Sequence, residues 1–239
     1  MANYRKVLPV YDVTAGTLQG FSASGRAIAP RTAPATAPGF YRRFAKRAFD
    51  VSLVLLAAPV VLPVIAFLAM LVAIDGGNPF YLQERIGAGG RTFRMWKLRT
   101  MVPDAKAALD TLLARDETAR IEWETTQKLK SDPRITRVGG FLRRSSLDEL
   151  PQLWNVFKGD MSLVGPRPMM PEQQILYSGD SYYRLRPGIT GPWQVSARNL
   201  STFAERAEFD LDYDLNLSLP TDLRILSSTV RVILRATGH

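Results

Sequence analysis

The sequence predicts a mixed α/β protein, mostly helical, in which a re-entrant membrane hairpin of helices precedes a small cytoplasmic domain with interfacial amphipathic helices. Three features predict this class. Residues 51–74 are apolar and uncharged, two alternating stretches flank a glycine-rich turn, and the chain ends in a basic amphipathic segment. The expected parts are a flexible tail at 1–40, a basic flank and membrane hairpin at 41–75, and the cytoplasmic domain at 76–239.

Composition restricts the chemistry. The chain has 239 residues, 46% of them hydrophobic, enough for one sizeable core or for one domain with a membrane element. Its net charge of +9 favours an anionic partner, such as lipid headgroups, a nucleotide or nucleic acid. The absence of cysteine excludes disulfides and thiolate catalysis. His239 is the single histidine and is terminal, which argues against a Ser-His-Asp triad or a histidine-rich zinc site.

Residues 1–40 are rich in proline, alanine, threonine, serine and glycine and contain few large apolar side chains. Burial of so few apolar groups does not offset the entropy lost when a chain is ordered, so this segment is expected to be a flexible tail. No apolar core follows a basic start, so the segment lacks the pattern of a secretory signal.

The apolar segment at 51–74 is the strongest physical signal in the chain. At 1.5 Å per residue, its roughly 24 residues would cross a hydrocarbon core of about 30 Å. Pro59 and Pro63 lie near its middle, and each removes an amide donor and bends a helix. Basic residues flank both ends, and positive charge prefers the cytoplasmic face. They are Arg42, Arg43, Lys46 and Arg47 before the segment and Arg85, Arg91, Arg94, Lys97 and Arg99 after it. A helix-break-helix that enters one leaflet and returns satisfies both observations, with a full crossing and a buried soluble helix as the alternatives.

After the apolar segment, alternation predicts two short strands, at 79–83 and 91–101, joined by a turn at the glycines of 87–90. A hairpin is favoured over a phosphate-binding loop because no Gly-Lys-Ser/Thr context follows. Residues 104–130 are predicted to form a surface helix with an apolar stripe. Residues 132–140 are predicted to form a turn that leads to the next segment.

The central candidate site is Asp148 with Glu149, two adjacent carboxylates at the predicted start of a helix. Ser146 and Glu149 have the spacing of a capping box. Pro151 is tolerated only in a first helical turn, so the helix is expected to begin near Asp148. It should run to a C-cap at Gly159.

Free amides at this helix start favour an anion, so a phosphate could bind there as readily as the carboxylates. Neighbours on a helix point about 100° apart, so Asp148 and Glu149 are not expected to be a matched acid and base across one bond. Different roles fit better: one carboxylate attacks or is protonated, and the other holds a metal or a cation. The alternative is a plain complement of the helix dipole. With Arg143 and Arg144 upstream and a Pro-Arg-Pro turn at Arg167 downstream, the pattern suits binding and cleavage of a phosphate ester.

Several motifs, in this order along the chain, resemble the bacterial sugar transferase family. They are Ser146-Leu147-Asp148-Glu149-Leu150, Lys158-Gly159-Asp160-Met161-Ser162, Val164-Gly165-Pro166-Arg167-Pro168 and Arg186-Pro187-Gly188-Ile189-Thr190-Gly191. The resemblance extends from residue 41 to the end of the chain. Members of this family are monotopic phosphoglycosyl transferases that start exopolysaccharide and other glycan assembly on polyprenyl phosphate, and they carry a re-entrant membrane helix.

The resemblance implies a reaction and a set of roles. Asp148 would attack a UDP-sugar, carrying galactose or glucose, expel UMP and form a phosphosugar-aspartyl intermediate. Polyprenyl phosphate would then attack this intermediate and receive the sugar phosphate. Asp148 and Glu149 would be catalytic and would hold Mg²⁺. The implied substrate-binding residues are Arg143, Arg167, Lys97, Arg99, Arg186 and Asp210. The implied location is the cytoplasmic face of the bacterial inner membrane.

Residues 222–235 place three arginines on one stripe of a helix and apolar side chains on another. Such a helix suits an anionic membrane surface, and packing into the core is the alternative. Two other functional classes remain: a non-catalytic basic membrane scaffold or regulator, and nucleic-acid binding. No recognised nucleic-acid domain accompanies the charge, so we expect no such partner. The sequence is compatible with an oligomer and does not specify one.

Overall fold

The computed structural model describes residues 39–126, 129, 131–196, 203 and 205–234, together with two short strands that precede them. These strands, β1 (Val10–Tyr11) and β2 (Gly20–Phe21), pair antiparallel. The chain divides into two compact units, Met1–Pro34 and Ala35–His239, and the elements given below belong to the second. Most of the predicted flexible tail lies outside the described residues, so that prediction stays untested.

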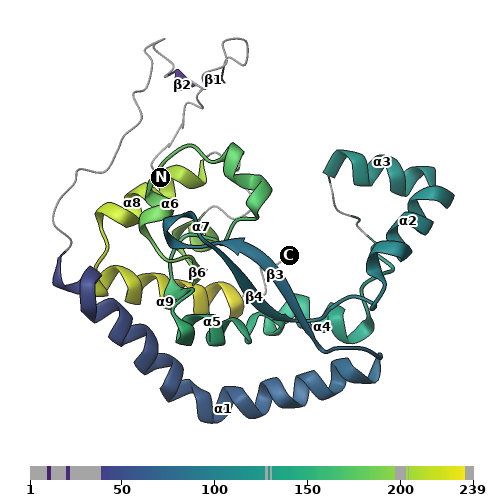
Figure 1. The fold of residues 1–239 in the computed structure, drawn as a ribbon, viewed down its shortest axis with the longest axis horizontal. Coiled ribbons are helices and arrows are strands. Elements are labelled where there is room, and N and C mark those ends of the chain that lie inside the picture. The colour runs from purple at the N-terminus through teal and green to yellow at the C-terminus, as the bar shows by residue number, and fades with distance from the viewer. Residues whose placement is uncertain are drawn as a thin grey trace. The chain divides into compact units, whose positions relative to one another are not determined.

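One long helix carries the apolar segment. A π-helical turn, η1 (Tyr41–Ala45), leads into α1 (Lys46–Ile74). Together they form the one helix, within the described ranges, that is long and apolar enough to cross a membrane. Pro59 and Pro63 lie inside a continuous α1, so the predicted break between two helices is wrong. Figure 1 shows α1 bent near its middle, as expected when each proline removes one hydrogen bond and leaves the neighbouring ones in place.

α1 exposes most of its large apolar side chains. Leu56, Val60, Phe67, Met70 and Ile74 are each more than half exposed. A helix with this surface is not the buried core helix of a soluble domain, which was one alternative from the sequence. An apolar surface of this kind requires lipid or another partner to cover it.

The predicted hairpin is present. β3 (Phe80–Ile86) pairs antiparallel with β4 (Thr92–Leu98). The connection contains the 3₁₀ turn η2 (Ala88–Gly90), in which Gly89 and Gly90 have φ of 68° and 77°. Side chains disfavour these values, so the glycines serve the turn.

Two helices replace the single helix predicted for 104–130. α2 (Ala105–Arg115) ends before Asp116, whose backbone is extended, and α3 (Glu117–Thr126) begins directly after it. The Asp116 carboxylate accepts a hydrogen bond from the amide of Ala119 at 3.0 Å. This side chain caps the start of α3 and thereby favours a break over a continuous helix. The last residues of the predicted helix lie outside the described ranges.

Two helices and a tight turn follow. α4 (Arg137–Ser145) takes up the end of the turn predicted at 132–140, which is therefore shorter than predicted. A 3₁₀ turn, η3 (Leu147–Glu149), leads to α5 (Gln152–Lys158). Gly159 ends α5 with φ of 95°, which confirms the predicted C-cap.

Short elements around two parallel strands complete the domain. They are β5 (Ser162–Val164), η4 (Pro171–Leu176), α6 (Ser181–Arg184), β6 (Gly188–Thr190), α7 (Pro192–Ser196), α8 (Arg206–Leu215) and α9 (Leu219–Leu234). β5 and β6 pair in parallel. A Cβ atom added to Gly188 would lie 2.1 Å from the amide nitrogen of Gly165, so the contact next to these strands requires glycine. The mixed, mostly helical α/β class predicted from the sequence is confirmed.

Buried polar contacts attach the start of α1 to the domain. Asp222 of α9 is fully buried and accepts a hydrogen bond from the Lys46 ammonium at 2.7 Å. It also accepts from the hydroxyls of Tyr41 and Tyr213, each at 2.6 Å. A buried carboxylate with three such donors ties together η1, α1, α8 and α9.

The basic flank before the apolar segment is largely paired within the protein. Arg42 donates to the Asp214 carboxylate at 2.6 Å, and Lys46 is buried against Asp222. Arg47 donates to two backbone carbonyls at the end of α5. These pairings weaken the argument for membrane orientation from the positive flank, because cations paired within the protein do not face lipid headgroups.

α9 packs one face into the core. Ile225 is buried against a cluster that includes Val164 and Leu185. Leu223 and Val230 are half exposed or more and lie outside this core. Core packing, the alternative from the sequence, therefore holds for the buried face. Contact of the exposed face with a membrane stays a prediction.

Candidate active site

Asp148 lies in a tight turn between helices and not at a helix start. Ser146 is the C-cap of α4, with φ of 56° and ψ of 19°, and is the one non-glycine residue with positive φ in the described part of the chain. Its side chain makes no capping hydrogen bond, so the predicted capping box with Glu149 is wrong, and α5 begins only at Gln152. Left-handed backbone at such a residue costs roughly 1–3 kcal/mol and is concentrated at functional sites.

Lys97 joins the two carboxylates. Its ammonium nitrogen, on β4, lies 2.8 Å from Oε1 of Glu149 and 3.9 Å from Oδ2 of Asp148. Burial raises the pKa of Asp148, while Lys97 opposes the rise, Glu149 adds to it and Arg143 opposes it. The two carboxylates thus have different surroundings: Glu149 holds a close cation, and Asp148 is a poorly solvated group whose charge depends on its neighbours.

Arg143 is fixed beside this pair by a close contact between α4 and the end of β4. Its Nε donates to Oγ1 of Thr100 at 2.8 Å. Gly139, one turn earlier, packs on the same residue: a Cβ there would lie 2.0 Å from the Thr100 carbonyl oxygen. Only glycine permits this approach. The contact holds the guanidinium of Arg143 near enough to Asp148 to oppose the rise in the pKa of Asp148.

Two other predicted binding residues hold backbone carbonyls. Arg99 donates to the carbonyls of Val72 and Asn78, at 3.1 and 2.9 Å, and so closes the end of α1. Arg186 is exposed and donates to the carbonyl of Gly159 at 3.1 Å, at the end of α5. These contacts give both arginines a structural role, and their contacts with substrate stay predictions.

Arg167 and Asp210 belong to a second cluster. The guanidinium carbon of Arg167 lies 5.7 Å from the centre of the Trp193 ring, and that of Arg206 lies 4.2 Å from it. Asp210 is 3% exposed, and burial raises its pKa to about 7, although Arg206 opposes the rise. The structure therefore groups Asp148, Glu149, Lys97 and Arg143 in one place and Arg167 with Asp210 in another.

Sequence reasoning missed Arg85 and Arg206. Arg85 was counted only as a charge after the apolar segment, and Arg206 precedes an acidic run with no motif of its own. Arg85 lies on β3 and Arg206 on α8, far apart in the sequence, so no local spacing connects them.

The donor set of the first group fits magnesium. Asp148 and Glu149 supply two carboxylates, and the described residues contain no group of three or more His, Cys, Asp or Glu side chains suited to a metal. Mg²⁺ is usually held by one or two protein carboxylates together with waters and substrate phosphates. Two carboxylates are therefore sufficient if a phosphate substrate supplies the remaining oxygens.

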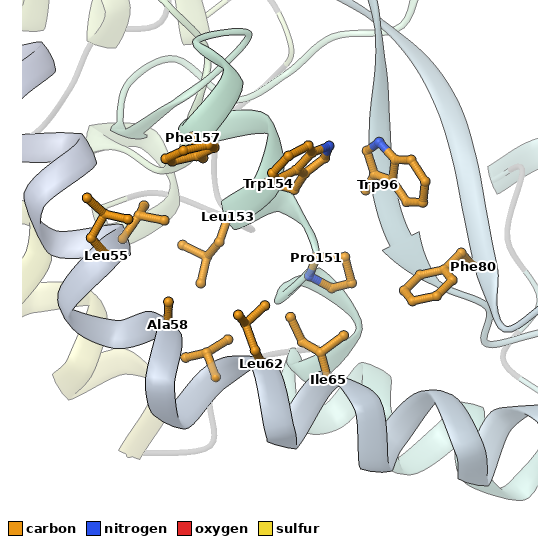
Figure 2. A pocket seen from close by; sticks show the side chains of 12 residues that line it. Leu55, Ala58, Leu62, Ile65, Phe80, Trp96, Pro151, Leu153, Trp154 and Phe157 are labelled. Carbon is orange, nitrogen blue, oxygen red and sulfur yellow. The ribbon is translucent and has the colours of Figure 1, made fainter.

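An apolar cavity of about 420 Å³ lies between α1, the β3–β4 hairpin and α5 (Figure 2). Its lining residues are Val54, Leu55, Ala58, Val61, Leu62, Ile65, Phe80, Trp96, Pro151, Leu153, Trp154 and Phe157. Two of them connect the cavity to the carboxylates along the chain: Pro151 follows Glu149 by two residues, and Trp96 directly precedes Lys97. The cavity thus lies along α1, and two of its lining residues are sequence neighbours of the charged group.

Comparisons with known proteins identify related chains. A family model described as bacterial sugar transferase matches residues 41–236. A UDP-galactose-lipid carrier transferase of Erwinia amylovora is 48% identical over 198 residues, and an undecaprenyl-phosphate galactose phosphotransferase of Salmonella typhimurium is 46% identical over 198 residues. An exopolysaccharide production protein, ExoY, of Sinorhizobium fredii is 43% identical over 196 residues.

These alignments differ in how much of each relative they cover. Each of the first two covers 82% of this chain and 42% of the relative, so the chain spans less than half the length of those proteins. The third covers 81% of this chain and 87% of the relative. In every case the alignment covers most of this chain, and the family model spans α1 and every element after it. The chain belongs to the bacterial sugar transferase family.

Proposed function

We propose that this protein transfers a sugar 1-phosphate, with galactose or glucose as the sugar, from a UDP-sugar to polyprenyl phosphate and releases UMP. This would be the first membrane step of exopolysaccharide assembly. The observation that carries the proposal is the buried Asp148 beside Lys97, in a turn next to an apolar cavity. The names of the relatives, a UDP-galactose-lipid carrier transferase and an undecaprenyl-phosphate galactose phosphotransferase, support these substrate classes.

The reaction has two halves. First, a carboxylate oxygen of Asp148 attacks the phosphorus that carries the sugar. The bond from this phosphorus to the bridging oxygen breaks, UMP leaves with the electron pair, and the sugar phosphate stays on Asp148. Then an oxygen of polyprenyl phosphate attacks the same phosphorus, and Asp148 leaves as a carboxylate.

Positive charge is needed because both substrates are anions. Lys97 and Arg143 supply it beside Asp148, from β4 and α4. Mg²⁺, held by Asp148 and Glu149 together with substrate oxygens, would neutralise further phosphate charge. Lys97 also opposes the rise in the pKa of Asp148 that burial causes, and so favours the ionised form that attacks phosphorus.

The proposal is tested by measuring UMP release from a panel of UDP-sugars by the purified full chain with undecaprenyl phosphate. We expect release from UDP-galactose or UDP-glucose. The same panel distinguishes a non-catalytic membrane scaffold, because such a protein would release UMP from none of them.

We further propose that α1 enters one leaflet and returns to the same, cytoplasmic face of the inner membrane. Its exposed apolar side chains support insertion into the membrane, and the bend near its middle supports a return to the same face over a full crossing.

This topology predicts the accessibility of single cysteines in a chain that has none of its own. Phe40→Cys and Arg91→Cys lie at exposed positions before and after α1. Both are expected to react with a membrane-impermeant maleimide in inside-out vesicles and to be protected in right-side-out vesicles. Labelling of the two positions from opposite sides would show that α1 crosses the membrane.

We also propose that the apolar cavity holds the first isoprene units of the acceptor lipid. Its lining is apolar, it lies along α1, and it adjoins residues that border Lys97 and Glu149 (Figure 2). A chain in this cavity would bring its phosphate to the carboxylates without leaving the membrane surface.

Filling the cavity is expected to impair use of the acceptor. Ala58→Trp should raise the KM for undecaprenyl phosphate roughly tenfold, as expected from losing about 1.4 kcal/mol of apolar contact. UMP release in a single turnover without acceptor should be unchanged, because that half-reaction does not use the cavity. Val60→Trp is the matched control, since Val60 is 69% exposed and does not line the cavity. Equal effects of both substitutions on KM would exclude the cavity as the acceptor site.

A further inference from the structure

Three guanidinium groups lie close together, and two of them lie against the Trp193 ring. Arg206 lies over its ring and also over the ring of Phe203, with its guanidinium carbon 4.2 and 4.6 Å from the two ring centres. Arg167 approaches the Trp193 ring to 5.7 Å. Burial and repulsion by Arg167 lower the pKa of Arg85, and burial with repulsion by Arg167 and Arg85 lowers that of Arg206 to about 10. Like charges held this close require compensation from another group.

The nearby carboxylates compensate only in part. Asp210 attracts Arg206, but its carboxylate also accepts from the Tyr177 hydroxyl at 2.8 Å, and burial raises its pKa to about 7. Glu149 attracts Arg85 from the neighbouring site and has an ammonium partner of its own at 2.8 Å. These two carboxylates therefore offset the charges of Arg206 and Arg85 only in part.

Two donors of the cluster are buried without a hydrogen-bond partner in the structure as described. They are Nε of Arg85 and Nε of Arg206. Proteins rarely leave buried donors unpaired, because the hydration lost on burial is not replaced. Unpaired buried Nε donors on half-buried arginines indicate that an anionic acceptor completes the cluster.

Arg85 is also held in place. Its Nη2 donates to Oε1 of Gln83 at 2.7 Å, and its Nη1 to the carbonyl of Pro168 at 3.4 Å. Pro168 directly follows Arg167, so this second contact ties Arg85 to the turn that carries Arg167. The arginines are thus arranged before any ligand binds, which lowers the entropy cost of binding.

The arginine cluster lies next to the Asp148–Glu149 pair, and it is separate from the core residues that pack against α1. Ile86, next to Arg85, packs with Met169 and Tyr182. The buried residues of α1, such as Val54 and Leu68, belong to other core clusters. A ligand at the arginines would therefore lie away from the helix that we place in the membrane.

We propose that Arg85, Arg167 and Arg206 form an anion site that binds the phosphate of the nucleoside monophosphate released in the first half-reaction. This inference rests on the proposed function and extends it by assigning the leaving group to these side chains. A phosphate monoester offers several charged oxygens to guanidinium forks. Polyprenyl phosphate carries the same headgroup, but its chain belongs along α1, so the position of the cluster favours the nucleotide.

The test is a calorimetric titration of the full chain in detergent, carrying Asp148→Asn to prevent turnover. UMP is one ligand, and farnesyl phosphate, a short lipid phosphate, is the other. Arg206→Gln is expected to weaken UMP binding about tenfold or more, the loss of one charge-assisted contact, and to change farnesyl phosphate binding less than about twofold. Arg206→Lys, which keeps the charge, should give an intermediate affinity. Arg224→Gln is the control, at an exposed arginine of α9.

Unchanged UMP affinity in Arg206→Gln would overturn the proposal, and so would a loss of farnesyl phosphate binding alone, which would assign the arginines to the lipid. Thermal unfolding of each variant shows whether it is folded, and Arg85→Lys and Arg206→Lys serve the same comparison if the glutamine variant is not. The protein could bind UMP in a way that depends on Arg206 and yet release no UMP from any UDP-sugar. This result would support the anion site and exclude the proposed activity.

Discussion

Asp148→Asn is expected to abolish steady-state UMP release, by roughly 10³-fold or more, and to remove the covalent adduct. The amide keeps the shape of the side chain but cannot attack phosphorus as a carboxylate does. Wild-type protein quenched with a UDP-sugar and no acceptor should carry one added sugar phosphate, which peptide mass spectrometry should locate on Asp148.

Asp180→Asn is the matched control, because Asp180 is exposed and lies outside both groups of site residues. It should retain the adduct and the rate of UMP release. An active wild-type protein that reacts only when both substrates are present, and never carries an adduct, would contradict the aspartyl mechanism while leaving the overall transfer in place.

Asp222→Ala is expected to lower the free energy of unfolding more than any other substitution proposed for this protein. It removes the acceptor of three hydrogen bonds, two of them buried, and leaves the Lys46 ammonium, in a residue that is 8% exposed, without its counter-charge. Breaking a buried pair in this way costs about 3–5 kcal/mol. The measurement is thermal and denaturant unfolding of the protein in detergent.

Asp212→Ala, at an exposed position of α8, is the control and should unfold like the wild type. The double variant Lys46→Met with Asp222→Leu should recover much of the lost stability, because it removes both charges from the buried site. A small effect of Asp222→Ala with no further change in the double variant would mean that the pair does not attach α1 to the domain.

The sequence predicted those features that depend on neighbours along the chain. The β3–β4 hairpin follows from alternation around glycines that the turn requires, and the end of α5 follows from Gly159. The start of α5 was misplaced because Ser146 takes a left-handed conformation, which a capping pattern alone does not reveal.

Features that depend on distant residues were not predictable. The sequence pattern places Lys46 in a membrane flank, but Lys46 is buried against Asp222, 176 residues away. Arg99 was assigned to phosphate from a resemblance, whereas its described contacts are with carbonyls at the end of α1. The arginines around Trp193 come from separate elements, and only the folded chain brings them together.

Arg99 gives the fold a mechanical property. It grips carbonyls at the end of α1, and it lies two residues after Lys97 on the same run of chain. In the proposed arrangement, a tilt of α1 caused by a change in bilayer thickness would act through Arg99 on the nearby ammonium of Lys97, beside the proposed nucleophile Asp148. The position of Lys97 would then depend on the tilt of α1, so turnover should respond to the acyl-chain length of the surrounding lipid.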